Sequence, residues 1–281
     1  MFGLIKRWRR SKLMRRPFPK GWELYLCENM ALYSRLPANL QSELRAKVLV
    51  LLSEKHFEGC GGLEITDEIR VTIAGNACLL LLNRKTAFYP HLVTILVYPS
   101  AFVVDRIKSG GFAPGMATAL PSIIEAAGLP SREDFEDYEG GPTFGESWDR
   151  GNVILAWDIA KRGALDPRDG LNVILHEFAH QLDSEAGDVD GAPQMESRQQ
   201  AKKWAEVFQR EYDQLCDDVD ADRETVIDDY GATNPAEFFA VCTETFFEKP
   251  HQLLEHHSEL YEQLKGFFKQ DPASWQRTPA G

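Results

Sequence analysis

The order of apolar and polar residues predicts a mainly helical chain. Apolar residues recur at helical spacing from Trp22 to about Lys55, and Leu36-Pro37 interrupts them. A second, largely apolar helix is expected over residues 68–84, with Thr66 suited to its first turn. Residues 57–68 contain three glycines and are expected to form the loop between these helical parts.

Two apolar runs have the length and composition of β-strands. They are residues 93–99, which Pro99 ends, and residues 152–160. Residues 106–147 are rich in glycine, proline and acids, and a long loop or lid is expected there. Helical patterns return at 171–183, 195–215, 234–250 and 251–270. The sequence therefore predicts an α+β fold, mainly helical, with a small sheet beside the helix at 171–183.

Composition limits the class of protein. The chain has 281 residues, 43% of them hydrophobic, and contains no apolar stretch long enough to span a membrane. Its five cysteines are scattered and form no Cys-x-x-Cys pair, so free thiols and a cytoplasmic protein are expected. We predict one domain over residues 22–281, with a helical part at about 22–90 and the candidate chemistry in 91–281.

Charge is unevenly distributed. Eight of the 31 Lys and Arg residues lie in residues 1–20, which contain no Asp or Glu, so the remaining chain holds 23 basic against 43 acidic residues. So acidic a body argues against direct binding of nucleic acid. The basic arm, residues 1–21, is expected to be a solvated and partly disordered tail. The alternative is an arm that docks on anionic lipid or on an acidic protein surface.

The most informative motif is His-Glu-x-x-His at residues 176–180. His176 and His180 are four residues apart, so on a helix both imidazoles face the same side and can bind one Zn²⁺. Glu177 adjoins the first histidine and is the candidate general base. The alternative to a zinc site is a pair of buried core histidines whose ring nitrogens are satisfied by hydrogen bonds. Asp169 or Asn172 is expected to cap this helix and Gly187 to end it.

A catalytic zinc needs a third protein ligand, which the downstream sequence must supply. Asn234-Pro235 is a helix start, and Glu237 follows in the first turn. Glu237 is the favoured ligand, although Asn234 and Glu237 also have the spacing of a capping box. The rivals are Glu244, two turns later on the same helix face, and a histidine such as His251 or His256.

Two further residues have candidate roles at the site. Tyr230 is suited to donate a hydrogen bond to a developing oxyanion, and its bland alternative is an ordinary half-buried tyrosine. Asp183, three residues after His180, is a candidate carboxylate for orienting a ligand histidine. It is equally suited to a surface contact or to ending the helix.

Together these segments resemble a known family. The chain is similar to the Mlc titration factor A family of zinc-dependent peptidases, a gluzincin-type group whose site resembles the catalytic domain of anthrax lethal factor. The matching segments are residues 57–68, 96–104, 145–160, 176–183, 230–247 and 268–272. The resemblance thus covers nearly the whole chain after the basic arm and implies a zincin-like metallopeptidase domain.

The resemblance also implies residue roles. His176, His180 and Glu237 would be the ligands of one Zn²⁺ per chain, Glu177 the general base, and Tyr230 a support for the transition state. It implies a peptide substrate and a second partner, a Mlc-like transcriptional repressor. Whether cleavage is exo, as in an aminopeptidase, or endo stays open. The rival of a different class is a non-catalytic protein that sequesters a repressor and has a structural or vestigial zinc site.

Overall fold

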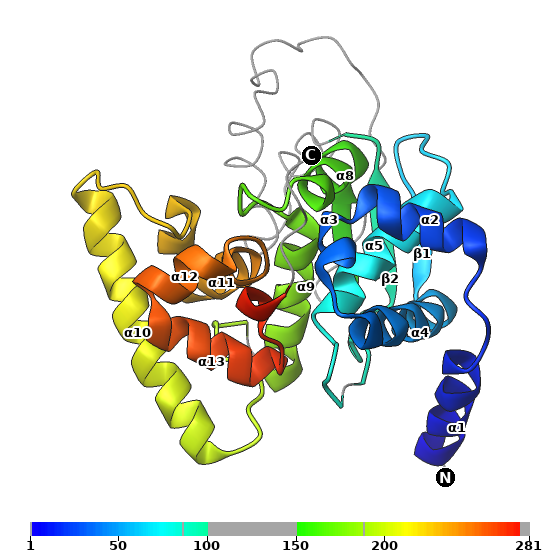
Figure 1. Ribbon diagram of the computed structural model, residues 1–281, viewed down its shortest axis with the longest axis horizontal. Coiled ribbons are helices and arrows are strands. Elements are labelled where there is room, and N and C mark those ends of the chain that lie inside the picture. Colours follow the sequence, from blue (N-terminus) through cyan, green and yellow to red (C-terminus); the bar gives the residue numbers. More distant parts are fainter. Residues whose placement is uncertain (1, 86, 101–150, 188, 276–281) are drawn as a thin grey trace, which may run out of the picture.

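Three short strands form a parallel sheet in the order β1-β2-β3. They are β1 (His56–Gly59), β2 (Thr94–Tyr98) and β3 (Asn152–Ala156), with His56 opposite Thr94 and Thr94 opposite Asn152. The computed structural model in Figure 1 describes residues 2–85, 87–100, 151–187 and 189–275. The predicted lid, residues 106–147, lies outside these ranges. Around the sheet the described chain is mainly helical, which confirms the predicted α+β class.

The pattern of burial explains why these runs form strands. In β2 the four residues from Ile95 to Tyr98 are all buried, as expected of a central parallel strand that is covered on both faces. In β3 Val153 and Leu155 are buried, whereas Ile154 is only half-buried. The predicted strand at 93–99 is therefore confirmed. It pairs with β3, and β3 contacts the helix that contains the His-Glu-x-x-His motif.

Two local predictions were wrong. Residues 56–59 form a strand where a loop was expected, because their backbone pairs with β2 despite the glycines that follow. The predicted strand at 152–160 ends at Ala156, and helix α8 (Trp157–Leu165) begins at the next residue. Ala156 lies opposite Tyr98, the last residue of β2. Pro99 follows Tyr98 in the chain and has no N–H with which to extend the pairing between β2 and β3. Strand β3 therefore ends at Ala156, and α8 begins.

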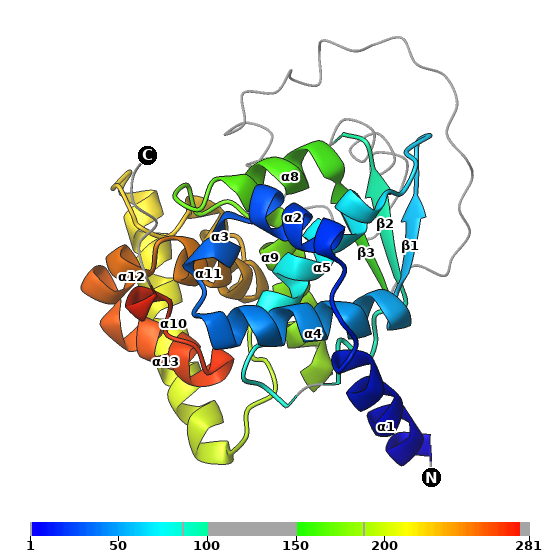
Figure 2. The ribbon, with the colours of Figure 1, turned by 45° about the vertical axis from the view of Figure 1, so that its right-hand side comes forward.

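The amino-terminal helices pack on one another beside the sheet, as Figure 2 shows. They are α2 (Lys20–Asn29), α3 (Ala31–Arg35), α4 (Ala38–Glu54) and α5 (Asp67–Leu79). Leu36-Pro37 separates α3 from α4, as predicted. The Thr66 hydroxyl accepts a hydrogen bond from the Ile69 N–H at 3.3 Å and caps α5, again as predicted. Helix α5 connects β1 to β2, which a parallel pair requires.

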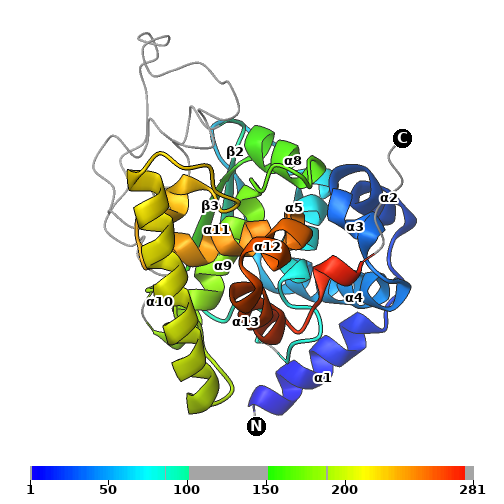
Figure 3. The ribbon, with the colours of Figure 1, turned by 60° about the vertical axis from the view of Figure 1, so that its left-hand side comes forward.

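Helices α9 (Val173–Asp183) and α11 (Pro235–Glu248) lie side by side in the interior. Helix α9 also contacts β3 and α5, and α11 is buried at every position from Ala236 to Glu248. Figure 3 shows the remaining helices packed outside this pair. They are α10 (Arg198–Asp220), α12 (Pro250–His256) and α13 (Ser258–Phe268), with short 3₁₀ turns at Ser184–Ala186, Asp229–Ala232 and Pro272–Ser274.

The basic arm is helical rather than disordered. Helix α1 (Phe2–Met14) lies against α4, and Arg10 forms a bidentate ion pair with Glu54 at 2.7 and 2.8 Å. This pair and the partly buried Leu13 and Met14 supply the contacts that a solvated tail would lack. Within the described ranges, no helix is both long and apolar enough to cross a lipid bilayer.

Candidate metal centre

The helix with the His-Glu-x-x-His motif begins at a side-chain cap. The Asn172 side-chain oxygen accepts a hydrogen bond from the Leu175 N–H at 3.2 Å. Of the two predicted caps, Asp169 and Asn172, it is therefore Asn172 that caps the helix. Asp169 instead accepts a hydrogen bond from the Leu171 N–H in the preceding turn. The α-helix ends at Asp183, and one 3₁₀ turn leads to Gly187, whose φ is 123°.

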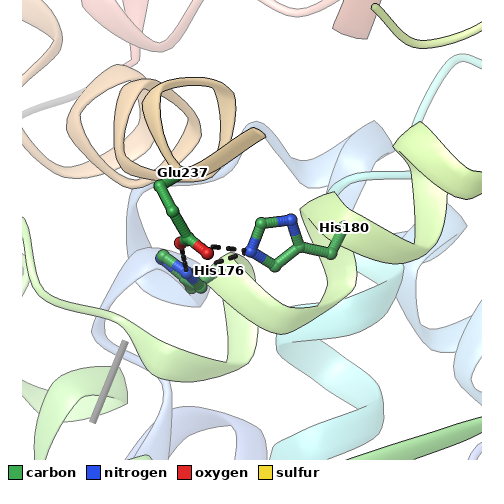
Figure 4. Close-up of side chains that lie close together, drawn as sticks. All are labelled: His176, His180 and Glu237. Atoms are coloured by element: carbon green, nitrogen blue, oxygen red, sulfur yellow. Dashed lines mark hydrogen bonds and ion pairs between the residues drawn. The ribbon is translucent and has the colours of Figure 1, made fainter. Parts of the chain in front are cut away.

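The second helix of the site begins at Asn234. Its side-chain oxygen accepts hydrogen bonds from the N–H groups of Ala236 and Glu237, at 3.0 and 3.1 Å. Pro235 occupies the first turn, where its missing N–H costs nothing. Helix α11 crosses α9 so that the Glu237 side chain points at the two motif histidines (Figure 4). The carboxylate therefore faces the histidines, as the ligand assignment requires.

Three side chains converge at this crossing. Oε2 of Glu237 lies 2.9 Å from Nε2 of His176 and 3.4 Å from Nε2 of His180. The two Nε2 atoms lie 3.2 Å apart, and the possible ligand atoms of all three residues fall within 4.8 Å of one another. His176 and Glu237 are buried, and His180 is half-buried, so the group is accessible from the side of His180.

These distances match the requirements of a zinc site. Two ligand atoms bound to one tetrahedral Zn²⁺ at its usual bond lengths lie about 3.3–3.4 Å apart. The three observed separations, from 2.9 to 3.4 Å, are close to that value. Two imidazole nitrogens and one carboxylate are also a common donor set for catalytic zinc. The residues present therefore fit one Zn²⁺ and leave a fourth position for water or substrate.

The opposite edge of the His176 ring meets a second carboxylate. Oε1 of Glu244 lies 2.8 Å from Nδ1 of His176, and its Oε2 accepts a short hydrogen bond from the Asn172 N–H. The Asn172 side-chain amide donates to Glu248 Oε1 at 3.0 Å, and all four residues are buried. A carboxylate behind a ligand histidine fixes the tautomer and the orientation of the ring. From the sequence alone Glu244 is only a rival zinc ligand, because no local pattern places it behind His176.

The charges of the site favour a bound cation. Burial lowers the pKa of His176, but the carboxylates of Glu244 and Glu237 outweigh this and raise the pKa to about 10. Burial raises the pKa of Glu237, and the two histidines more than offset this, so its pKa lies well below the usual range. The carboxylates thus favour positive charge at His176, and a bound divalent cation would supply that charge in place of the proton.

The other predicted site residues take different positions. The Tyr230 ring lies 6.1 Å from the His176 ring, centroid to centroid, on the 3₁₀ turn Asp229–Ala232. Glu177 is half-buried on α9. Asp183 is buried and accepts a hydrogen bond from the Gly191 N–H at 2.7 Å, but its other oxygen bonds to no histidine. The rivals His251 and His256 are exposed on α12 and are not members of the cluster.

Most of the chain matches a known protein family. The profile of the glucose-regulated metallo-peptidase M90 family matches residues 5–114 and 126–269. The chain belongs to this family. The matched residues include the His-Glu-x-x-His helix and Glu237, and the family is one of metallopeptidases.

Relatives in several bacteria extend over most of the chain. "Uncharacterized protein slr2042" of Synechocystis is 40% identical over 266 residues, covering 94% of this chain and 89% of its own. "Mlc titration factor A" of Escherichia fergusonii is 30% identical over 84% of this chain and 82% of its own. The protein of the same name from Salmonella agona is 30% identical over 89% and 88%. The chain is thus similar to these proteins in nearly their full length.

Proposed function

We propose that this protein is a zinc-dependent peptidase whose metal is held by His176, His180 and Glu237. The convergence of these three side chains in one buried cluster carries the proposal. Glu244 supports it, because a histidine with carboxylates at both ring nitrogens is held in one orientation. The small sheet beside α9 is consistent with a zincin-like domain. When bound, Zn²⁺ would act as a Lewis acid that polarises a carbonyl and makes water more acidic.

The remaining chemistry is assigned to side chains of this chain. Glu177 would accept a proton from the attacking water and return it to the leaving amine. The Tyr230 hydroxyl would donate a hydrogen bond to the peptide oxygen as negative charge develops on it. Strand β3 contacts α9 and is one of the two outer strands of the sheet in the part of the chain that the structure describes. We assign the substrate backbone to its free edge, where strand addition would hold an extended peptide.

Metal analysis tests this proposal. We expect about one zinc per chain, with peptidase activity lost on chelation and restored by added Zn²⁺. His176→Ala should abolish zinc binding, because a catalytic zinc seldom persists on two protein ligands. The matched control is His256→Ala, which removes an exposed imidazole from α12 and should keep both metal and activity. Protein that contains no zinc and takes up none would exclude the proposal.

A second candidate function is repressor binding. It is favoured by the relatives named Mlc titration factor A, which this chain matches over more than four-fifths of their length. On this view the protein sequesters a Mlc-like transcriptional repressor and does not contact nucleic acid. Co-elution with purified Mlc on gel filtration would support it. If Glu177→Gln still bound Mlc but had lost peptidase activity, the two functions would be separable in one chain.

A further inference from the structure

Helix α1 (Phe2–Met14) presents two different sides. Its inward side is fixed to the rest of the molecule: Arg10 pairs with Glu54 and also donates to the Ala87 carbonyl at 2.7 Å. Leu13 and Met14 pack against the core from the same side. Because these contacts set the rotation of the helix about its axis, the opposite side has a defined direction and faces solvent.

The outward side combines exposed apolar residues with cations. The Ile5 and Trp8 side chains are 59% and 66% exposed, the latter the highest exposure among the large hydrophobic residues described. Lys12 places its ammonium 5.5 Å from the centre of the Trp8 ring. These three residues are spaced i, i+3 and i+7, so they lie along one helix face. Exposed arginines lie near this face: Arg7 and Arg9 on α1, and Arg15 and Arg16 directly after its last residue, Met14.

The charge of the helix contrasts with that of the remaining chain. Residues 1–20 contain eight Lys or Arg and no acidic residue, whereas the rest of the chain contains 23 basic and 43 acidic residues. An anionic surface would therefore attract α1 and repel the remainder. Helix α1 stands at the edge of the molecule in Figures 1 and 2, so such a surface could reach it from outside.

We propose that this face of α1, formed by Ile5, Trp8, Lys12 and the nearby arginines, docks on an anionic lipid bilayer. Indole rings favour the boundary between headgroups and acyl chains, and Lys and Arg reach the phosphates with their charged ends while their stems stay apolar. Nucleic acid would offer phosphates to the cations, but it has no apolar layer that could cover the Ile5 side chain. An acidic protein surface would need an apolar pocket matched to Trp8. The lipid surface satisfies both the cations and the apolar side chains.

Vesicle sedimentation with the full-length protein tests this proposal. At low salt, we expect the protein to pellet with vesicles containing about one-third phosphatidylglycerol and to stay in solution with pure phosphatidylcholine. Raising the salt should release it, since the attraction is screened beyond about 10 Å at 0.1 M ionic strength. The tryptophan emission that Trp8 contributes, obtained by difference from Trp8→Phe, should shift to the blue on binding. Failure of the wild-type protein to pellet would overturn the proposal.

Paired variants locate the surface. Arg9→Gln with Lys12→Gln should weaken binding roughly 30-fold, the loss expected for two cations near an anionic membrane. Ile5→Ser with Trp8→Ser should remove the blue shift and weaken binding further. The controls are Lys202→Gln with Lys203→Gln on α10, and Leu24→Ser, which is 58% exposed on α2. Equal losses in the controls would overturn the proposal.

Soluble polyanions separate lipid from other anionic partners. Polyglutamate and a short DNA duplex should compete only weakly with the vesicles, because neither can accept Ile5 and Trp8. Binding to polyglutamate without binding to vesicles would assign the face to an acidic protein instead. All variants change exposed side chains, and circular dichroism should show unchanged helix content. The metal centre is not involved, so the outcome does not depend on the proposed peptidase function.

Discussion

Glu244 Oε1 lies 2.8 Å from Nδ1 of His176, while Glu237 Oε2 lies 2.9 Å from Nε2 of the same ring. The two glutamates are two helical turns apart on α11 and hold opposite edges of one imidazole. Only Glu237 also approaches His180, at 3.4 Å. This relationship gives the two carboxylates different expected roles, Glu237 as a zinc ligand and Glu244 as the group that orients a ligand.

The first prediction separates these roles. Glu244→Gln should weaken zinc binding by roughly 10–100-fold, the usual cost of losing a carboxylate behind a ligand histidine. Glu237→Ala should weaken it far more, because a protein ligand is lost outright. Competition titrations with a chromogenic chelator measure both affinities. A variant at Glu237 that holds zinc while the one at Glu244 loses it would require the two roles to be exchanged.

The second prediction concerns the tyrosine. Tyr230→Phe should keep the full zinc content and lower kcat by roughly 10²–10³-fold, the cost of removing one donor to a developing oxyanion. The matched control is Tyr212→Phe, because the Tyr212 hydroxyl donates to the Ala232 carbonyl and helps to hold the turn that carries Tyr230. An equal loss of kcat in the control would mean that the turn, rather than the Tyr230 hydroxyl, matters.

The third prediction is a pH dependence of stability at Asp183. Burial raises the pKa of Asp183 from 3.8 to about 6, although the Gly191 N–H opposes this. The folded state thus binds a proton more tightly than the unfolded state, so the free energy of unfolding should fall as the pH rises from about 4 through 6. The full loss is roughly 3 kcal/mol, since each pKa unit corresponds to about 1.4 kcal/mol.

Asp183→Asn tests this linkage because it keeps the oxygen that accepts from Gly191 and removes the charge. On zinc-free protein, denaturant unfolding should show the variant more stable than wild type at pH 8, with the difference shrinking towards pH 4. Asp217→Asn, at an exposed position on α10, controls for the loss of one negative charge. A difference that does not change with pH would refute the assignment.

Spacing rules predicted the parts of the site that lie within one segment. His176 and His180 are four residues apart, so any α-helix brings their rings together, and a helix does form there. Asn234-Pro235 likewise predicted the start of α11, and with it the position of Glu237 in the first turn. The cap at Thr66 and the strand at 93–99 were predicted for the same reason, because local chemistry decides them.

Contacts between segments could not be predicted from the sequence. Glu237 and Glu244 share a helix face, and only the crossing of α9 and α11 decides which of them reaches both histidines. Residues 56–59 form a strand because their backbone pairs with β2. The three glycines in and after this segment indicate only a loop, so the local sequence does not reveal the pairing. Helix α1 is ordered through Arg10 and Glu54, which are 44 residues apart in the chain.

The proposed peptidase chemistry depends most on Glu177, which would act as the general base at the zinc site. The most direct measurement is the kcat of Glu177→Gln together with its zinc content. We predict one zinc per chain, as in the wild type, and a loss of roughly 10²–10⁴-fold in kcat, the usual contribution of a general base. Glu185→Gln, which removes a carboxylate in the 3₁₀ turn after α9, should leave both quantities unchanged. Near-normal turnover of Glu177→Gln at full zinc occupancy would contradict the account.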